Sequence, residues 1–379
     1  MKKRPLYFDY MATTPVDMRV VECMLPYLGV EGDFGNPAST THIYGEVAAR
    51  AVEHARAQIA EVIGCASLES IIFTSGATEA NNLAILGSVG FYKRKGLHII
   101  TLTTEHKAVL DSFKHLEKNG FEVTYLNPKP DGLLDLDVLK HTLRSDTILV
   151  SIMHVNNEIG VIQDIQAIGE LLQGKGILFH VDAAQSIGRL PLNLSVLPVD
   201  LMSFSAHKAY GPKGIGALYV RQKPRIRLQP QSFGGGHEGG RRSGTLPTHQ
   251  IVGMGKAFAL AEVLREDEQA RILSLRMRFL EGIKALSNIR INGHVTQRIA
   301  GNINLCFQGM EHDELLMRLH ELAVSTTSAC ASSRQSSSHV LLALGLSHAD
   351  AQSSLRFSFG RFTTEEDIDY AVKLITHRL

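Results

Sequence analysis

Long apolar runs and net charge are both missing from this sequence. No apolar run approaches the roughly 18 residues that a membrane-spanning helix needs, so we expect no membrane contact. The 39 Lys and Arg residues oppose 38 Asp and Glu residues, a net charge of +1. This balance gives no electrostatic reason to wrap nucleic acid, and we expect no direct nucleic-acid partner. The N-terminus MKKRPLYFDY starts basic, but Asp9 interrupts the apolar segment of a signal peptide, which favours a cytoplasmic protein.

Cysteine is also scarce, with four residues and no C-x-x-C pair, which argues against a disulfide framework. Apolar neighbours surround Cys23, Cys65 and Cys306, and this predicts small buried side chains. Cys330 differs, because it lies in the polar stretch VSTTSACASSRQSSSHV (324–340). The sequence therefore predicts one thiol in a polar, mobile loop.

A chain of 379 residues is too long for one ordinary core, so two domains are expected. From residue 98 onward, apolar strands alternate with helices. Nearly continuous apolar strands of this kind are typical of a mostly parallel sheet that is covered on both faces. The predicted strands are 98–103, 121–126, 147–155 and 177–185, with two more in DLMSFSAHK and IGALYVR, and the predicted helices are 107–118, 135–144 and AIGELLQGKG.

The pattern changes near residue 247, where a long helical stretch begins and runs to about residue 285. Its apolar spacing predicts one face packed on the sheet domain and a link to a second domain. A smaller α+β domain follows, with strands at 302–307 and 354–359 and helices at 312–321, 338–344 and from Thr364. We therefore expect a large domain at 15–260 and a small domain made of 1–14 and 261–379, which carries the Cys330 loop.

Several polar residues fall at strand ends, where ligands bind in open α/β sheets. In FTSGATEANNLAI (73–85) a strand gives way to Ala77, Thr78 and a helix, whose free N–H groups suit a phosphate. An ordinary threonine N-cap explains the same letters. Asp182 ends the apolar strand of FHVDAAQS, and it points into a cleft or caps a helix.

Lys208 in SFSAHKAYGPKG follows an apolar strand and is crowded by Ser205, His207 and Tyr210. A buried amine with a lowered pKa can form a Schiff base with a carbonyl group. The GPKG letters lack the spacing of a Walker loop.

His106 and Asn157 end two further strands, although a lone histidine is more often structural or a cap. The zinc-binding motif H-E-x-x-H is absent. The nearest match, HEGGR, has Arg241 in the position of the second histidine, so no metal site is predicted. Together the features supply what pyridoxal 5′-phosphate needs: a carboxylate for the ring nitrogen, a lysine for the aldehyde, a ring that stacks, and a helix start for the phosphate.

At the level of longer motifs the sequence resembles the cysteine desulfurases of the NifS/IscS type, in the class V aminotransferase group. The resemblance runs over nearly the whole chain and rests on FDYMATTPVD, FGNPAST, FTSGATEANNLAI, TTEHKAVLD, SIMHVNNEIG, HVDAAQS, SFSAHKAYGPKGIGALYVR, GGGHEGGRRSGT, TSACAS and SSLRFSFGRFTTEEDID. It implies the α/β fold of the aspartate aminotransferases (fold type I), with a large, mostly parallel sheet domain and a small α+β domain. It also implies a homodimer.

The resemblance assigns roles to individual residues. Lys208 would bind the cofactor, Asp182 would pair with its ring nitrogen, His106 would stack on the ring and relay protons, and Gln185 would contact the ring hydroxyl. The phosphate would be held by Ala77, Thr78, Ser205, His207 and, from the neighbouring subunit, Thr245.

The resemblance further implies that Arg356 pairs with the carboxylate of the substrate L-cysteine and that Asn157 lies near the cofactor and the same carboxylate. Lys208 would remove the Cα proton. Cys330 would attack the substrate sulfur, which leaves L-alanine and a persulfide on Cys330 for transfer to an acceptor protein. His106 would help to ionise the Cys330 thiol, since a free thiol has a pKa of about 8.5.

Alternatives remain at the level of the residues. A selenocysteine lyase or another class V aminotransferase would use the same cofactor without the thiol, and a non-catalytic scaffold would use neither. The acceptor could serve iron–sulfur cluster assembly, tRNA thiolation or DNA phosphorothioation. Relatives of the IscS branch carry a C-terminal segment that docks the iron–sulfur scaffold, whereas this chain ends at Leu379 inside a predicted helix. Met11 replaces a residue that is often small in relatives, and the loop lacks a proline before Ser338 and His339.

Overall fold

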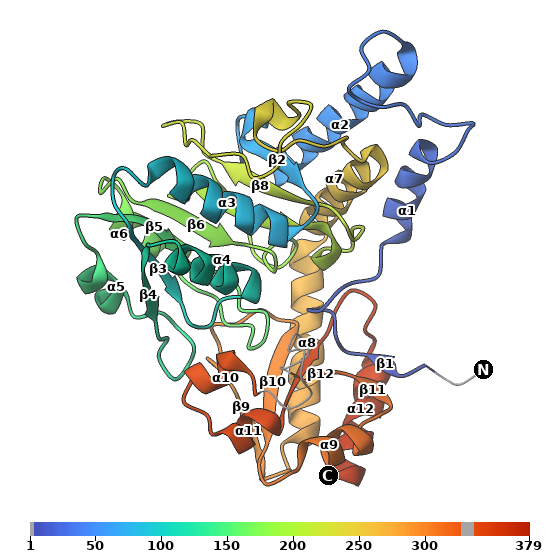
Figure 1. Ribbon diagram of the computed structural model, residues 1–379. Coiled ribbons are helices and arrows are strands. Elements are labelled where there is room, and N and C mark those ends of the chain that lie inside the picture. Colours follow the sequence, from blue (N-terminus) through green and yellow to red (C-terminus); the bar gives the residue numbers. More distant parts are fainter. Residues whose placement is uncertain (1–3, 327–336) are drawn as a thin grey trace.

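The computed structural model describes residues 4–326 and 337–379. Figure 1 shows a wide sheet with helices in the upper part of the molecule and a second, smaller sheet in the lower part. The wide sheet has seven strands, and only β8 runs antiparallel to its neighbours, so the prediction of a mostly parallel sheet is confirmed. Its spatial order is β2 (Ile71–Thr74), β8 (Gly216–Val220), β7 (Leu201–Ser205), β6 (Leu178–Asp182), β5 (Thr147–Ser151), β3 (His98–Leu102) and β4 (Glu122–Leu126).

Helices cover both faces of this sheet. Neighbouring residues of β3 show why, since Ile99 packs into the core beneath α3 (Ala77–Tyr92) and α4 (Lys107–Lys118). Ile100 packs into the opposite core, against α2 (Ile43–Val62), α6 (Ile165–Leu172) and α7 (Thr248–Val263). Side chains alternate across a strand, so a strand buried on both faces reads as a continuous apolar run. The outer helices are α1 (Met18–Met24) and α5 (Leu136–Thr142).

The smaller sheet is antiparallel and has the order β12 (Ser325–Thr326), β13 (Ser354–Ser358), β10 (Asn302–Phe307) and β9 (Ile289–Ile291). Its core is rich in phenylalanine, with Phe279, Phe307 and Phe357 fully buried. The surrounding helices are α8 (Arg265–Ile283), α9 (His312–Arg318), α10 (His339–Ala343), α11 (His348–Gln352) and α12 (Glu365–Arg378). The predicted α+β composition of this part is therefore correct.

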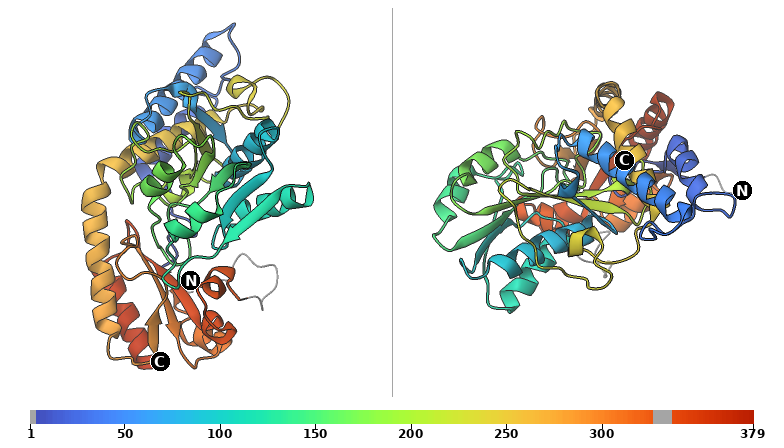
Figure 2. Two further views of the ribbon diagram at one scale, coloured as in Figure 1. Left: turned by 90° about the vertical axis from the view of Figure 1, so that its left-hand side faces the viewer. Right: turned by 90° about the horizontal axis from the view of Figure 1, so that it is seen from above.

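The long helical stretch predicted after residue 247 is two helices, not one. α7 ends at Val263 and α8 begins at Arg265. Ile251, Met254 and Phe258 of α7 lie in the core of the wide sheet, whereas Phe279 of α8 lies in the core of the small sheet. The helix is interrupted between α7 and α8 because α7 packs in the core of the wide sheet and α8 packs in the core of the small sheet. Figure 2 shows α8 running beside both parts. The proposed domain division at 15 and 260 stays a prediction.

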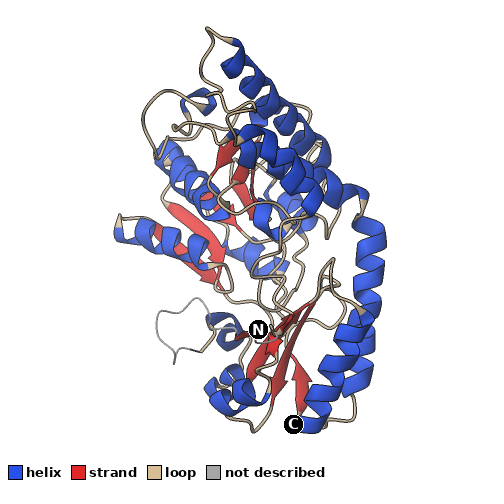
Figure 3. Ribbon diagram, turned by 90° about the vertical axis from the view of Figure 1, so that its right-hand side faces the viewer, coloured by secondary structure: helices blue, strands red, loops and turns tan. Residues whose placement is uncertain are grey.

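The first described residues lie against the small sheet (Figure 3). β1 (Leu6–Tyr7) pairs with β11 (Leu322–Ala323), and Phe8 belongs to the small core. The chain then crosses to the wide sheet, where the Thr14 N–H donates to the His207 carbonyl at 2.9 Å. This crossing brings the residues between Phe8 and Thr14 to the junction of the two parts.

The cysteines follow the prediction only in part. Cys306 is buried, but Cys23 and Cys65 are half-buried, because they lie on the outer helix α1 and just after the end of α2. Cys330 lies outside the described residues. Within the described ranges, no helix is long and apolar enough to cross a membrane.

The junction holds a buried charge cluster whose loss we expect to be costly. Arg361 Nη1 donates to Asp17 at 2.7 Å and Arg361 Nε pairs with Glu268, and all three side chains are nearly buried. Arg361→Ala leaves the nearly buried Glu268 without its arginine and removes one of the two arginines that pair with Asp17, so urea unfolding should show a loss of about 3–5 kcal/mol in the free energy of unfolding. Arg278→Ala removes an exposed pair with Asp369 and should cost less than about 1 kcal/mol. Similar losses in the two variants would contradict this reading of the junction.

Candidate active site

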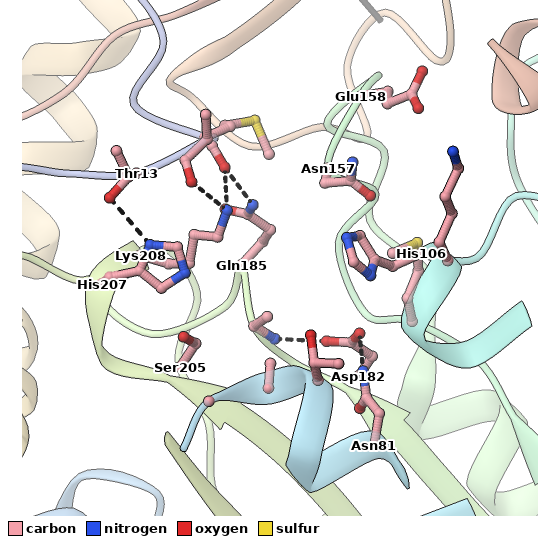
Figure 4. A pocket seen from close by; sticks show the side chains of 18 of the residues that line it. Thr13, Asn81, His106, Asn157, Glu158, Asp182, Gln185, Ser205, His207 and Lys208 are labelled. Atoms are coloured by element: carbon pink, nitrogen blue, oxygen red, sulfur yellow. Dashed lines mark hydrogen bonds between the residues drawn. The ribbon is translucent and has the colours of Figure 1, made fainter. Parts of the chain in front are cut away.

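A cavity of about 800 Å³ lies at the junction of the two parts. Its volume is that of a small-molecule site. The wide sheet contributes the carboxyl ends of several parallel strands, as predicted, and the small sheet contributes Ser325 and Arg356. Ten of the predicted site residues line the cavity: Ala77, Thr78, His106, Asn157, Asp182, Gln185, Ser205, His207, Lys208 and Arg356. Figure 4 shows Lys208, His106 and Asp182 around the same space.

Asp182 ends strand β6 and is almost fully buried. Its Oδ2 accepts a hydrogen bond from Asn81 Nδ2 at 2.7 Å, and its Oδ1 accepts one from the Ala184 N–H at 3.0 Å. The prediction of a cleft residue is therefore confirmed, whereas the alternative of a helix cap is wrong, because a turn and not a helix follows Asp182. These donors fix the carboxylate in position.

Lys208 is held by backbone carbonyls of the N-terminal crossing. Its Nζ donates to the carbonyls of Met11 and Ala12, each at 2.7 Å (Figure 4). Burial lowers the pKa of Lys208 to about 7, and the cations Arg356 and Arg189 act in the same direction. An amine with this pKa is available as a nucleophile and as a base near neutral pH.

The turn that carries Lys208 is hydrogen-bonded to Thr14, at the end of the same N-terminal segment. Thr14 Oγ1 donates to the His207 carbonyl at 3.0 Å and accepts from the Tyr210 N–H at 2.8 Å. Tyr210 has a φ of 63°, a left-handed conformation that a bulky residue rarely adopts. The hydrogen bond from Tyr210 to Thr14 holds this conformation and so fixes the direction of the lysine.

The start of α3 is open to an anion. Gly76 is its N-cap and no side chain caps the helix, so the reading of Thr78 as an ordinary N-cap is wrong. Gly76 has a φ of 152°, and a Cβ on Gly216 of β8 would lie 2.6 Å from Gly76 Cα. Two glycines are therefore needed where the helix start meets the sheet. The uncapped N–H groups lie at the cavity and suit a phosphate.

His106 and Gln185 complete the middle of the cavity. His106 caps α4, with its Nδ1 accepting from the Ala108 N–H at 3.1 Å, and burial lowers the pKa of its imidazole. Gln185 Nε2 donates to the Met11 carbonyl at 2.9 Å, while its buried Oε1 has no partner within the described residues. A buried acceptor without a donor is costly, which indicates that a ligand donor belongs there.

Arg356 lies on the small-sheet side of the cavity. Its Nη1 donates to the Asn157 carbonyl and its Nη2 to Asp9 Oδ1, each at 2.6 Å. The predicted neighbours Arg356 and Asn157 are thus in contact, through the backbone carbonyl of Asn157. Asp9 was not among the predicted site residues.

Two buried acids near the cavity were also missed. Glu158 is hydrogen-bonded by Ser338, and burial raises the pKa of Glu158 to about 7. Glu105 is fully buried, which raises the pKa of its carboxyl well above its usual value. Its carbonyl accepts from His339 at 3.0 Å. Glu158 directly follows Asn157 in the sequence NNEIG. This position next to a predicted site residue is the one signal from which the sequence could have predicted Glu158 as part of the site.

Two predicted residues are not placed in the cavity. Thr245 is exposed and lies outside the cavity of its own chain. Cys330 falls outside the described residues. Among the residues that the structure describes, no group of three or more His, Cys, Asp or Glu side chains could hold a metal ion.

The arrangement fits pyridoxal 5′-phosphate. The buried carboxylate of Asp182 suits a protonated ring nitrogen, the orphan Oε1 of Gln185 suits a ring hydroxyl, and the uncapped start of α3 suits the phosphate. The amine of Lys208 is the group that binds an aldehyde.

The pKa of Lys208 gives a testable pH dependence. Only the neutral amine attacks the aldehyde, so the rate of cofactor rebinding to the cofactor-free protein should rise with pH and level off above about 7. Stopped-flow absorbance at the cofactor band measures this rate. A rate that keeps rising toward pH 10, the range of an exposed lysine, would show that burial does not lower the pKa of Lys208.

Known proteins support the same interpretation. The sequence matches the family described as Aminotransferase class-V over residues 6–371. The cysteine desulfurase IscS of Enterobacter sp. (strain 638) is 56% identical over 377 residues, which cover 100% of this chain and 93% of that protein. A solved NifS-like protein has a TM-score of 0.91 and 36% identity, covering 98% of both chains. SspA in complex with cysteine has a TM-score of 0.83 and 38% identity, covering 95% of this chain and 100% of that one.

These matches confirm the resemblance found in the sequence and the fold expected from it. The chain belongs to the class-V aminotransferase family and, within it, to the cysteine desulfurases that depend on pyridoxal phosphate.

Proposed function

We propose that the protein removes sulfur from L-cysteine, releases L-alanine, and carries the sulfur as a persulfide on Cys330 to an acceptor protein. The observation that carries the proposal is one cavity that holds an amine of lowered pKa, Lys208, together with the Asp182 carboxylate and the Arg356 guanidinium. Cysteine is bound in the related structure of SspA. The same cavity suits a small α-amino acid beside the cofactor.

The bound cofactor supplies an electron-accepting ring at the reaction centre. Asp182 keeps the ring nitrogen protonated, because its carboxylate is fixed by Asn81 and by the Ala184 N–H. His106 would stack on the ring, and Gln185 Oε1 would accept a hydrogen bond from the ring hydroxyl. Ala77, Thr78, Ser205 and His207 hold the phosphate, and burial lowers the pKa of His207 to about 4. His207 is therefore neutral at pH 7 and serves as a hydrogen-bond partner, not as a cation.

Lys208 moves the proton at the substrate Cα. With a pKa of about 7, a substantial share of Lys208 is neutral at neutral pH, so it can take this proton and later return it. The Met11 and Ala12 carbonyls accept from Nζ, and these contacts hold the amine at the cavity when it is free. Arg356 binds the substrate carboxylate, and Asn157 lies beside it.

Cys330 is the sulfur acceptor in this scheme. Its thiolate attacks the substrate sulfur, an S–S bond forms, and the C–S bond breaks with its electron pair going to the substrate carbon, which ends as L-alanine after protonation. His106 Nδ1 accepts from the Ala108 N–H, so the neutral ring carries its proton on Nε2 and can donate a hydrogen bond to the Cys330 thiolate. The described residues Ser325 and Ser337, on either side of Cys330 in the sequence, line the cavity.

A homodimer is part of the proposal. Apolar side chains around α1 and the start of α2 are exposed in the monomer, which is typical of an interface; these are Leu25, Leu28, Val30, Phe34, Ile43 and Tyr44. The segment that leads to Thr245 is fixed to α2 by a buried ion pair between Arg56 and Glu238 at 2.8 Å. Thr245 is exposed, and in the dimer it would reach the phosphate site of the neighbouring subunit.

The acceptor serves iron–sulfur cluster assembly, tRNA thiolation or DNA phosphorothioation, and contact with nucleic acid passes through a partner protein. We place the protein in the cytoplasm, because its sulfur-carrying thiol must stay reduced between turnovers.

Cys330→Ala tests the sulfur step. L-Alanine and sulfide released from L-cysteine, in the presence of a reductant, should fall to background in this variant and remain high in the wild type. Cys306→Ala, which removes a buried thiol remote from the reaction, is the matched control and should keep activity. Alanine release that survives in Cys330→Ala would indicate lyase chemistry without a persulfide.

Mixing inactive subunits tests the dimer. Lys208→Ala removes the base, and Thr245→Asp places a negative charge against the phosphate of the neighbour. In a mixed dimer, one site regains both wild-type residues, so alanine release should return when the two variants are refolded together. Without return of activity, Thr245 does not serve the neighbouring site.

A further inference from the structure

The cavity contains an ion pair that has no part in the scheme above. Arg356 Nη2 donates to Asp9 Oδ1 at 2.6 Å, with side-chain exposures of 7% and 22%. Both side chains line the cavity. Arg356 comes from β13, in the middle of the small sheet, and Asp9 from the N-terminal crossing. The arginine proposed to bind substrate thus already holds a carboxylate of its own chain.

The donors of Arg356 are largely occupied. Nη1 donates to the Asn157 carbonyl at 2.6 Å, Nη2 donates to Asp9, and the buried Nε has no partner within the described residues. An arginine binds a carboxylate best through two neighbouring N–H groups. A substrate carboxylate on the Nε and Nη2 edge would therefore meet Asp9 at one of the two positions.

Charge sets the direction of this competition. Without ligand, Asp9 neutralises a nearly buried guanidinium, which would otherwise remain as an unpaired interior charge. With ligand, two carboxylates share one guanidinium, and their repulsion is strong in a partly dry cavity. The presence of Asp9 thus stabilises the empty site and disfavours the occupied one.

We propose that Asp9 is an internal counter-ion that competes with the α-carboxylate of substrate and product for Arg356, and that it thereby weakens the binding of both. The inference rests on the proposed role of Arg356. L-Cysteine and L-alanine carry the same α-carboxylate. Strong binding of this carboxylate by Arg356 would therefore stabilise the product complex as much as the substrate complex. Asp9 therefore promotes release of L-alanine and acts as a positioning residue for the arginine.

Propionate is the probe, because it carries the carboxylate without the amine or the thiol. Its inhibition constant against L-cysteine is measured with the holoenzyme, and propionamide, which has similar shape and no charge, is measured beside it. Asp9→Asn removes the charge and keeps the size. Asp17→Asn is the matched control, since it breaks another nearly buried pair, Asp17 with Arg361, whose residues do not line the cavity.

In Asp9→Asn the inhibition constants of propionate and L-alanine should fall about tenfold, and kcat should fall as product release slows. Propionamide should be unaffected, and Asp17→Asn should behave like the wild type toward propionate. Asp9→Ser, a second variant without the carboxylate, should give the same shift and covers the case in which the asparagine variant folds poorly.

Unchanged or weaker propionate binding in Asp9→Asn and Asp9→Ser, with binding abolished in Arg356→Ala, would overturn this inference alone: Arg356 would remain the carboxylate site and Asp9 would only orient it. Propionate inhibition that survives in Arg356→Ala would overturn the proposed role of Arg356, and the inference with it.

Discussion

The backbone of residues 8–14 is the constraint on which the site depends. Its carbonyls at Met11 and Ala12 accept the Lys208 amine, and Met11 also accepts from Gln185. Thr14 pins the turn after the lysine, while the Phe8 carbonyl accepts from the Ser358 N–H of the small sheet at 2.7 Å. One short segment therefore sets the lysine, the glutamine and, through Asp9, the arginine relative to one another. Main-chain carbonyls hold Lys208 and Gln185, whereas the side chains of Thr14 and Asp9 make the contacts to the turn and to Arg356, so positions 9 and 14 depend on their side chains.

Burial acts on the charges of the cavity in opposite directions. It lowers the pKa of Lys208 and raises the pKa of Glu158, both to about 7, because a poorly solvated site disfavours whichever form is charged. His207 and His106 follow the same rule, with pKa values below the usual range. Of these groups, Lys208 and Glu158 can exchange protons near neutral pH. Asp182 and Arg356 are instead held by hydrogen bonds to partners of the fold. This division separates groups that move protons from groups that bind and orient.

Much of the fold and the cavity could be predicted from the sequence. Apolar strands with polar residues at their ends located His106, Asp182 and Lys208 at one edge of the wide sheet, because parallel strands end at the same edge. The reversed direction of β8 and the break at Leu264 could not be predicted, since both depend on tertiary packing. Asp9, Glu105 and Glu158 were missed for a similar reason. A single acid in a sequence does not show whether the fold brings an arginine, a serine or a buried carbonyl to it.

A crystal structure of the holoenzyme with L-alanine would test the central claim most directly, that these residues form one cofactor and substrate site. We expect the cofactor in this cavity, with its ring nitrogen within hydrogen-bond distance of Asp182 and its phosphate at the start of α3. We also expect Lys208 to be released from the Met11 and Ala12 carbonyls and the alanine carboxylate to lie on Arg356. A cofactor bound elsewhere, or a ring nitrogen that faces away from Asp182, would contradict this claim.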